Sequence, residues 1–107
     1  SIADAGELDG KAVWCPDTKR GLVFARDQVT PYFVKGYSIA WGEMEAYYLE
    51  GTSEVKWSSN FCCGGTSYLN RETLKSNAYG QCEVSSKKSI MVILNLIIAN
   101  AKKKNKI

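Results

Sequence analysis

The chain has 107 residues, of which 45% are hydrophobic and 23% charged. This size and composition are those of one globular domain, and they exclude a disordered chain. Histidine is absent, which removes the commonest general base and metal ligand and the usual partner of serine or cysteine nucleophiles. The net charge of +3 is uneven, because residues 87–107 hold six lysines and no acid, whereas residues 1–86 hold eleven acidic and eight basic residues. The body is therefore mildly acidic, and we do not expect it to bind nucleic acid.

We expect residues 1–10 to form a loose leader in which Leu8 is the one residue that packs against the rest of the domain. From residue 11 to residue 84, short apolar runs alternate with turn residues, a pattern typical of β-strands. Pro31 lies inside one of these runs, and because proline cannot donate a ladder hydrogen bond, we expect it at a sheet edge or at a bulge. The expected strands cover residues 12–15, 21–25, 29–34, 37–41, 43–49, 55–57, 68–69, 73–74 and 79–84.

Strands at this spacing, with no helix between them, are typical of an antiparallel meander. We expect one helix over residues 85–103, with Ser85 or Ser86 as its N-cap. Residues 104–107 would form a basic tail. The sequence therefore predicts a single, mainly β domain over residues 1–107. We expect a small antiparallel sheet over 11–84, curled into a barrel or a half-barrel and packed by the C-terminal helix.

The predicted helix carries more apolar surface than one sheet face needs. Met91, Val92 and Leu96 widen its apolar arc, and they either complete the core or form a face for a partner, such as a homodimer mate or a lipid surface. The apolar run 90–99 is interrupted by a polar residue and is too short to span a bilayer, so no transmembrane segment is expected. The main apolar face holds Ile90, Ile93, Leu94, Ile97 and Ala101.

Four cysteines in a short chain indicate an oxidising compartment, so we expect a periplasmic or secreted protein. Cys15 and Cys82 lie in the first and last predicted strands, which are neighbours if the sheet closes. We predict a disulfide between them; the alternative is two small buried hydrophobic side chains. The sequence leaves open whether Cys62 and Cys63 form a strained ring, bridge other cysteines or stay free, and a redox-active pair is the sharpest hypothesis for them. No zinc site is expected without a Cys-x-x-Cys pair or a histidine.

Glu43 and Glu45 lie on one face of a predicted strand. They are either an acid–base pair or two carboxylates that face solvent. No catalytic residue, metal site or cofactor is predicted on this basis.

Tyrosines supply the best binding hypothesis. Tyr37, Ile39 and Trp41 alternate with the small residues Ser38 and Ala40, a pattern that would place these three side chains in the core. Tyr32, Tyr48 and Tyr68 would then show on the other face as ligand-binding aromatics that stack on bases, sugars or a protein partner.

Several short motifs occur in a fixed order: Trp14-Cys15, Gly21-Leu22-Val23-Phe24, Trp57, Leu69-Asn70-Arg71-Glu72-Thr73-Leu74 and a late Cys82. Over about residues 8–84 this order resembles small uncharacterised exported proteins of marine bacteria, a domain of unknown function. The resemblance implies that the protein is exported and shares the fold of these proteins, and it implies little about an activity. More loosely, a cysteine in the first strand matched by one in the last is similar to the periplasmic inhibitors of C-type lysozyme, which are small β-barrels. Their Ser-Gly-x-x-Tyr inhibitory loop is absent here.

The leading hypothesis is a non-enzymatic exported domain that binds a protein, a small molecule or an envelope component. One alternative is an inhibitor of a wall-degrading enzyme. From a different class, the alternative is a redox protein that uses Cys62 and Cys63. A structural role would use the partner face of Met91, Val92 and Leu96 to form a homodimer.

Overall fold

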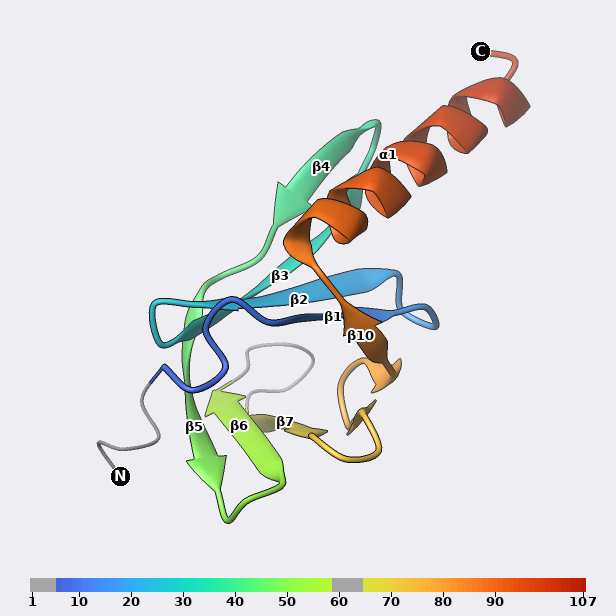
Figure 1. The fold of residues 1–107 in the computed structure, drawn as a ribbon. Helices are drawn as coiled ribbons and strands as arrows, with labels where there is room; N and C mark the ends of the chain where they lie inside the picture. Colours follow the sequence, from blue (N-terminus) through green and yellow to red (C-terminus); the bar gives the residue numbers. More distant parts are fainter. Residues whose placement is uncertain (1–5, 59–64) are drawn as a thin grey trace.

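The structure is a computed structural model, and it describes residues 6–58 and 65–107. The sheet is long and strongly twisted, and the one helix of these described residues leaves it at one end (Figure 1). The strands are β1 (Ala12–Cys15), β2 (Arg20–Ala25), β3 (Gln28–Lys35), β4 (Ser38–Trp41), β5 (Glu45–Glu50), β6 (Glu54–Ser58), β7 (Thr66–Asn70), β8 (Lys75–Ser76), β9 (Gly80–Gln81) and β10 (Glu83–Ser85), and the helix is α1 (Lys87–Lys104).

All strand pairs are antiparallel, in the order β10-β1-β2-β3-β5-β6-β7-β8-β9, and β4 adds to β3. The two ends of this order, β9 and β10, are separated in the chain by Cys82 alone. The sheet therefore curls back on itself into a nearly closed barrel, and the predicted mainly β fold with one C-terminal helix is confirmed. The strand predicted over 79–84 is instead two short strands, because the chain changes its partner at Cys82 from β8 to β1.

Pro31 lies at the place where β3 changes its neighbour. Residues 32–35 pair with β4 and residues 28–29 pair with β5. The backbone N–H of Gly42 donates to the Pro31 carbonyl at 2.8 Å. The N–H and C=O of one strand residue point to the same side, so the N–H that proline lacks would face this break between β4 and β5, where no ladder bond is lost.

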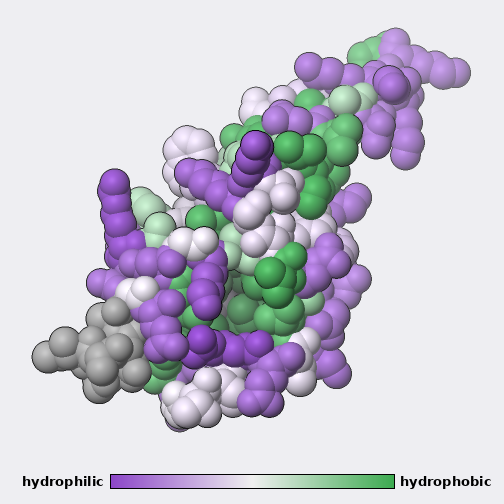
Figure 2. Space-filling model, in the orientation of Figure 1, coloured by the Kyte–Doolittle hydropathy of each residue, from purple (hydrophilic) through white to green (hydrophobic). Residues whose placement is uncertain are grey.

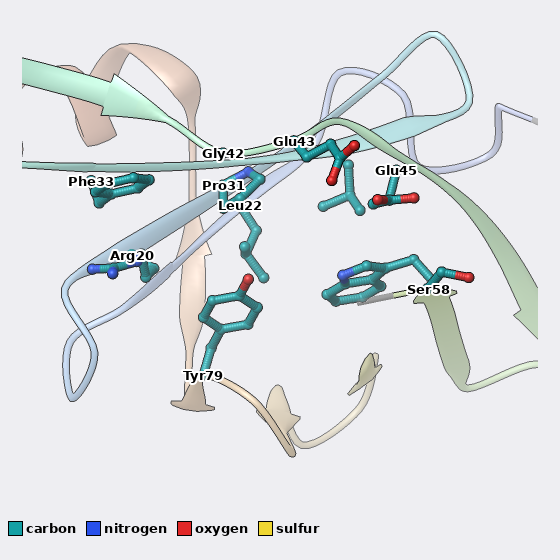
Figure 3. Close-up of a pocket in the computed structure, with 11 residues that line it drawn as sticks. Arg20, Leu22, Pro31, Phe33, Gly42, Glu43, Glu45, Ser58 and Tyr79 are labelled. Carbon is teal, nitrogen blue, oxygen red and sulfur yellow. The ribbon is translucent and has the colours of Figure 1, made fainter. Parts of the chain in front are cut away.

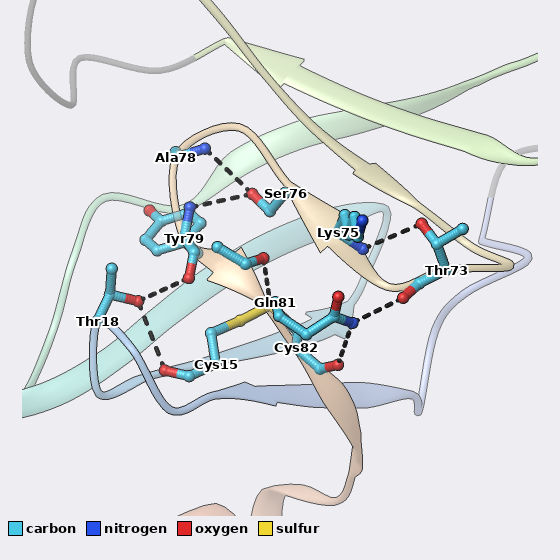
Figure 4. The surroundings of a disulfide bond; sticks show 10 residues. Cys15, Thr18, Thr73, Lys75, Ser76, Ala78, Tyr79, Gln81 and Cys82 are labelled. Carbon is cyan, nitrogen blue, oxygen red and sulfur yellow. Dashed lines mark hydrogen bonds between the residues drawn. A yellow bond between two sulfur atoms is a disulfide. The ribbon is translucent and has the colours of Figure 1, made fainter.

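The predicted disulfide between Cys15 and Cys82 is present and joins residues 67 positions apart in the chain. It links the end of β1 to the junction of β9 and β10 (Figure 4). Nearby, the Thr18 hydroxyl donates to the Tyr79 carbonyl at 3.1 Å, and the Cys82 N–H donates to the Leu74 carbonyl at 2.8 Å. Covalent and hydrogen bonds thus hold together the two ends of the sheet.

Hydrophobic side chains form two clusters on opposite faces of the sheet. Inside the barrel, the ring of Phe24 lies edge-on to Tyr47 and Trp57, with centroids 5.3 and 6.3 Å apart. Outside the barrel, Ile90 and Leu94 of α1 pack against the sheet. Both faces of β1 are covered, because its alternate residues point to the two clusters, and all four of its residues are buried.

The helix begins where its sequence predicts. The Ser86 side chain accepts a hydrogen bond from the N–H of Ser89 at 3.1 Å, as an N-cap does. Ile90, Leu94 and Ile98, spaced four apart, form the buried face of the helix.

Residues 6–10 are not a loose leader. Leu8 is buried in the barrel core, as expected, and the Gly10 N–H donates to the Phe24 carbonyl at 2.8 Å. The Asp9 carboxylate accepts the N–H of Asp27 in the β2–β3 turn at 3.1 Å. The prediction was wrong for these residues because their polar and glycine-rich composition gave no sign of these long-range bonds.

Candidate functional site

Two of the three predicted ligand-binding tyrosines come together on the outer face of the sheet. Tyr48 of β5 pairs directly with Lys56 of β6, which pairs directly with Tyr68 of β7. We call these three residues the tyrosine row. Tyr48 and Tyr68 are 54% and 39% exposed. They lie two strand spacings apart, about 9.6 Å, with the lysine between them.

Tyr32 does not belong to this row. It pairs directly with Trp41, so both lie on the face of the β3–β4 hairpin that α1 covers in part. The Lys87 ammonium lies 5.6 Å from the centroid of the Tyr32 ring. Tyr37 and Trp41 share this face but are exposed, so their expected place in the core was wrong, whereas Ile39 packs against the outer cluster. The hairpin extends beyond the barrel, and the helix covers only part of it (Figure 1).

Two carboxylates lie next to the lysine of the tyrosine row. The Lys56 ammonium forms an ion pair with Glu50 and lies 3.8 Å from Glu54. The hydrogen bond that the Lys56 ammonium donates to Glu50 is the main reason why the pKa of Lys56 is raised. None of the three residues of the row lines either of the two pockets described below, and an open surface is a weaker candidate for a small ligand than a concave one.

A pocket of about 230 Å³ opens at the break between β4 and β5 (Figure 3). The Arg20 guanidinium stacks over the Phe33 ring, 4.3 Å from its centroid, on one side of the pocket. Glu43 and Glu45 lie on the other side, and the Tyr79 ring points in between. The structure therefore brings the two predicted carboxylates to one pocket, but it sets them opposite an arginine rather than beside a nucleophile.

Tyr79 is the buried titratable group of this pocket. Burial raises the pKa of its phenol, while the positive charge of Arg20 acts in the opposite direction. The phenol is therefore neutral at physiological pH and serves as part of the wall, as the buried Leu22 and Trp57 do.

A larger pocket of about 440 Å³ lies at the seam of the barrel, where the start of β1 and β10 face the turn between β7 and β8. We call it the seam pocket. Figure 2 shows it as a hollow with hydrophobic walls and hydrophilic side chains along its lower edge. Its apolar wall consists of Leu8, Val13, Phe24, Leu69, Leu74 and Val84.

The apolar wall belongs largely to the barrel core. Leu8, Val13, Phe24 and Leu69 are buried, so the pocket reaches inward to the interior cluster. Val84 of β10 is 80% exposed and forms part of the lip. The mouth of a β-barrel is a common place for a ligand site, because core side chains are accessible there without unfolding the sheet.

Two cationic side chains, Lys11 and Arg71, line the seam pocket. Arg71 lies 3.4 Å from a carboxylate oxygen of Glu7, and its other terminal nitrogen donates to the Thr52 carbonyl at 3.4 Å. Both distances are long for charge-assisted bonds. Arg71 is thus held in place but weakly neutralised, and Lys11 is exposed.

Sequence reasoning missed the seam pocket and its two cations. Lys11 and Arg71 are 60 positions apart and each looks like an ordinary surface charge. The one available signal was the predicted closure of the sheet, which brings the start of the first strand near the last hairpin.

The predicted partner face on α1 divides between core and surface. Val92 and Leu96 are exposed, whereas Met91 is partly buried against the outer cluster. Cys62 and Cys63 lie outside the described residues.

Comparison with family models, curated proteins and solved structures found no match. Within residues 6–58 and 65–107, no helix is both long and apolar enough to cross a membrane, and no group of three or more cysteine, aspartate or glutamate side chains is placed to hold a metal ion.

Proposed function

We propose that this protein is an exported binding domain that holds a small amphiphile, with an apolar body and an anionic head group, in the seam pocket. The observation that carries the proposal is the combination of an apolar wall, continuous with the barrel core, and two cations at the rim. The disulfide between Cys15 and Cys82 supports export, because such bonds persist in oxidising compartments.

The size of the pocket supports a small-molecule ligand. Its volume of about 440 Å³ lies within the range of ligand-binding cavities. An aliphatic chain placed against Leu8, Phe24 and Leu69 would be removed from water, which stabilises a complex by about 25 cal/mol per Å² of apolar surface.

The rim determines the polarity of the ligand. A carboxylate at the mouth would lie near Arg71 and Lys11, and it would compete with Glu7 for the guanidinium. Charge-assisted bonds to arginine are strong when they are short and well aligned. Because the contact to Glu7 is long and exposed, replacing it with a ligand carboxylate costs little.

Titration calorimetry with dodecanoate, kept below its micelle-forming concentration, tests the proposal. We expect binding of dodecanoate and much weaker binding of dodecyltrimethylammonium, which has the same chain and the opposite charge. Arg71→Gln should weaken dodecanoate binding about tenfold, the loss expected when one charged hydrogen bond is removed. Glu7→Gln should strengthen it, because a competing carboxylate is gone.

Val84 provides a matched pair of variants that the fold should tolerate, because its side chain is exposed at the lip. Val84→Lys should strengthen dodecanoate binding and Val84→Glu should weaken it. Lys35→Gln, on the exposed end of β3, is the control and should leave binding unchanged. Equal binding of the two ligands, or the same affinity in both Val84 variants, would refute the proposed site.

A further inference from the structure

The helix α1 has a second apolar stripe that faces away from the sheet. With 3.6 residues per turn, positions spaced four, four, three and four apart fall on one side of a helix. On α1 this side carries Lys88, Val92, Leu96, Ala99 and Lys103, all exposed. We call these five residues the outer stripe. Val92 and Leu96 are 54% and 57% exposed, so each holds a large apolar side chain in solvent.

Contacts with the β3–β4 hairpin hold the helix in one orientation. The ammonium groups of Lys87 and Lys102 each lie 5.6 Å from a ring centroid, those of Tyr32 and Tyr37 respectively. The side-chain amide of Asn105 donates to the Tyr37 hydroxyl. These contacts secure both ends of α1, and the outer stripe therefore has a fixed direction. The C-terminal half of the helix projects beyond the barrel (Figure 1).

The charge of this region is of one sign. Residues 87–107 contain six lysines and no acidic residue. Lys88 and Lys103 lie at the two ends of the outer stripe, about 22 Å apart along the axis. Lys104 and Lys106 follow at the exposed C-terminal end.

This charge disfavours a second copy of the chain as the partner. Two outer stripes packed against each other would bring lysines of both helices together with no carboxylate from either one, and like charges at short range are repulsive. An anionic surface that also accepts apolar side chains fits the stripe better. Lysines that flank an apolar segment extend their ammonium groups to lipid head groups while their methylenes stay in the interface.

We infer that the outer stripe docks the protein on a bilayer that contains anionic lipid, with α1 lying along the membrane surface. Val92 and Leu96 enter the boundary between head groups and acyl chains, and Lys88, Lys103, Lys104 and Lys106 contact lipid phosphates. Two signals of this kind, a short apolar patch and a cluster of lysines, together give reversible membrane binding.

Flotation with lipid vesicles tests the inference on the full chain. We expect the protein to float with vesicles of phosphatidylcholine mixed with phosphatidylglycerol, and to bind vesicles of phosphatidylcholine alone at least about tenfold more weakly. Binding should fall as salt is raised, because salt shortens the distance over which exposed charges attract.

Two double variants separate the apolar and the charged contributions. Val92→Ser with Leu96→Ser and Lys103→Gln with Lys104→Gln should each lower the bound fraction on mixed vesicles severalfold. Arg26→Gln with Lys75→Gln removes the same net charge from exposed sites on the barrel and is the control, which should float as the parent protein does. All these side chains are exposed, so circular dichroism should show an unchanged fold.

Three outcomes would overturn the inference. The first is no flotation with mixed vesicles. The second is unchanged flotation of the Val92 and Leu96 variant together with full competition by duplex DNA, since the lysines would then contact any polyanion. The third is a dimer in light scattering that the Val92 and Leu96 variant converts to a monomer, because the stripe would then bind a second copy.

Discussion

At the residue scale, Asp9 joins the segment before β1 to the sheet. Its carboxylate accepts the N–H of Asp27 at 3.1 Å and the hydroxyl of Tyr47 at 2.8 Å, and that hydroxyl accepts the N–H of Leu8 at 3.1 Å. Arg26 and Asp27, in the turn between β2 and β3, have φ values of 54° and 61°. Side chains other than glycine, asparagine and aspartate rarely adopt this left-handed conformation. The hydrogen bond that the Asp27 N–H donates to Asp9 therefore stabilises a turn in which Arg26 adopts a conformation that its side chain disfavours.

Tyr47 makes the protein sensitive to high pH. Burial, with the hydrogen bond to Asp9, raises the pKa of Tyr47 from 10.0 to about 12. Because the folded-state pKa lies above the unfolded value, the contribution of the neutral phenol to stability is complete below pH 10 and is lost as pH rises through about 12. Tyr47→Phe should lower the free energy of unfolding at pH 8 by about 1–3 kcal/mol, because Leu8 and Asp9 lose their partner.

Urea unfolding at pH 8 and at pH 11 measures both effects. The parent protein should lose more stability between these two values than Tyr47→Phe does, since the variant has no phenol at this position to ionise. Tyr68→Phe, which changes an exposed ring of the tyrosine row, should unfold at pH 8 as the parent does. An identical loss in the parent and in Tyr47→Phe would show that other groups cause the alkaline instability.

At the element scale, one glycine lets α1 reach the sheet. A β-carbon on Gly21 of β2 would lie 2.4 Å from a methyl carbon of Ile90 and within 3 Å of two more of its side-chain carbons. Ile90 is fully buried in the outer cluster, so it has no free space to move into. The close approach of helix and strand therefore depends on the missing side chain.

Gly21→Ala should lower the free energy of unfolding by about 1–3 kcal/mol, the usual cost of overpacking a core. Ile90→Ala should cost about 2–5 kcal/mol, through lost burial and the cavity that remains. In the double variant the added methyl enters this cavity, so the alanine at position 21 should cost nothing further. Denaturant unfolding of the four proteins gives the coupling energy, and strict additivity would contradict the predicted contact.

At the scale of the whole molecule, the disulfide holds the two ends of the sheet together. It connects β1 to the chain between β9 and β10, and the same chain pairs with β8 on one side and β1 on the other. A bond across 67 residues stabilises the fold chiefly by restricting the unfolded chain, by about 4 kcal/mol on the loop-entropy model.

Replacing Cys15 and Cys82 together by alanine should lower the midpoint of thermal unfolding by roughly 15 °C, since each kcal/mol corresponds to about 4 °C or more in a chain of this size. Calorimetry measures the shift. Reductant should lower the midpoint of the parent protein toward that of the variant. A further loss when the variant itself is reduced would come from Cys62 and Cys63. A shift of only a few degrees would mean that the strand pairing closes the barrel without the bond.

Much of the fold could be read from local patterns. Strands 12–15 and 21–25 and the Ser86 cap follow from alternation, turn residues and side-chain capping, which depend on neighbours in the chain. The bond between Cys15 and Cys82 followed from one topological assumption, that the first and last strands meet. These features were predictable because a few consecutive residues carry the physical signal for each of them.

The tertiary structure determined which residues come together in the tyrosine row and in the seam pocket. Strand register placed Tyr48 and Tyr68 on either side of Lys56, and it placed Tyr32 on another part of the outer face, against α1. No local pattern specifies which residues face each other across strands that are far apart in the chain. The seam pocket is the clearest case, since its walls come from segments between residues 8 and 85. The sequence by itself thus determined most of the elements, the buried face of the helix and the pair of cysteines that could meet, while the curvature and closure of the sheet determined which side chains share a pocket.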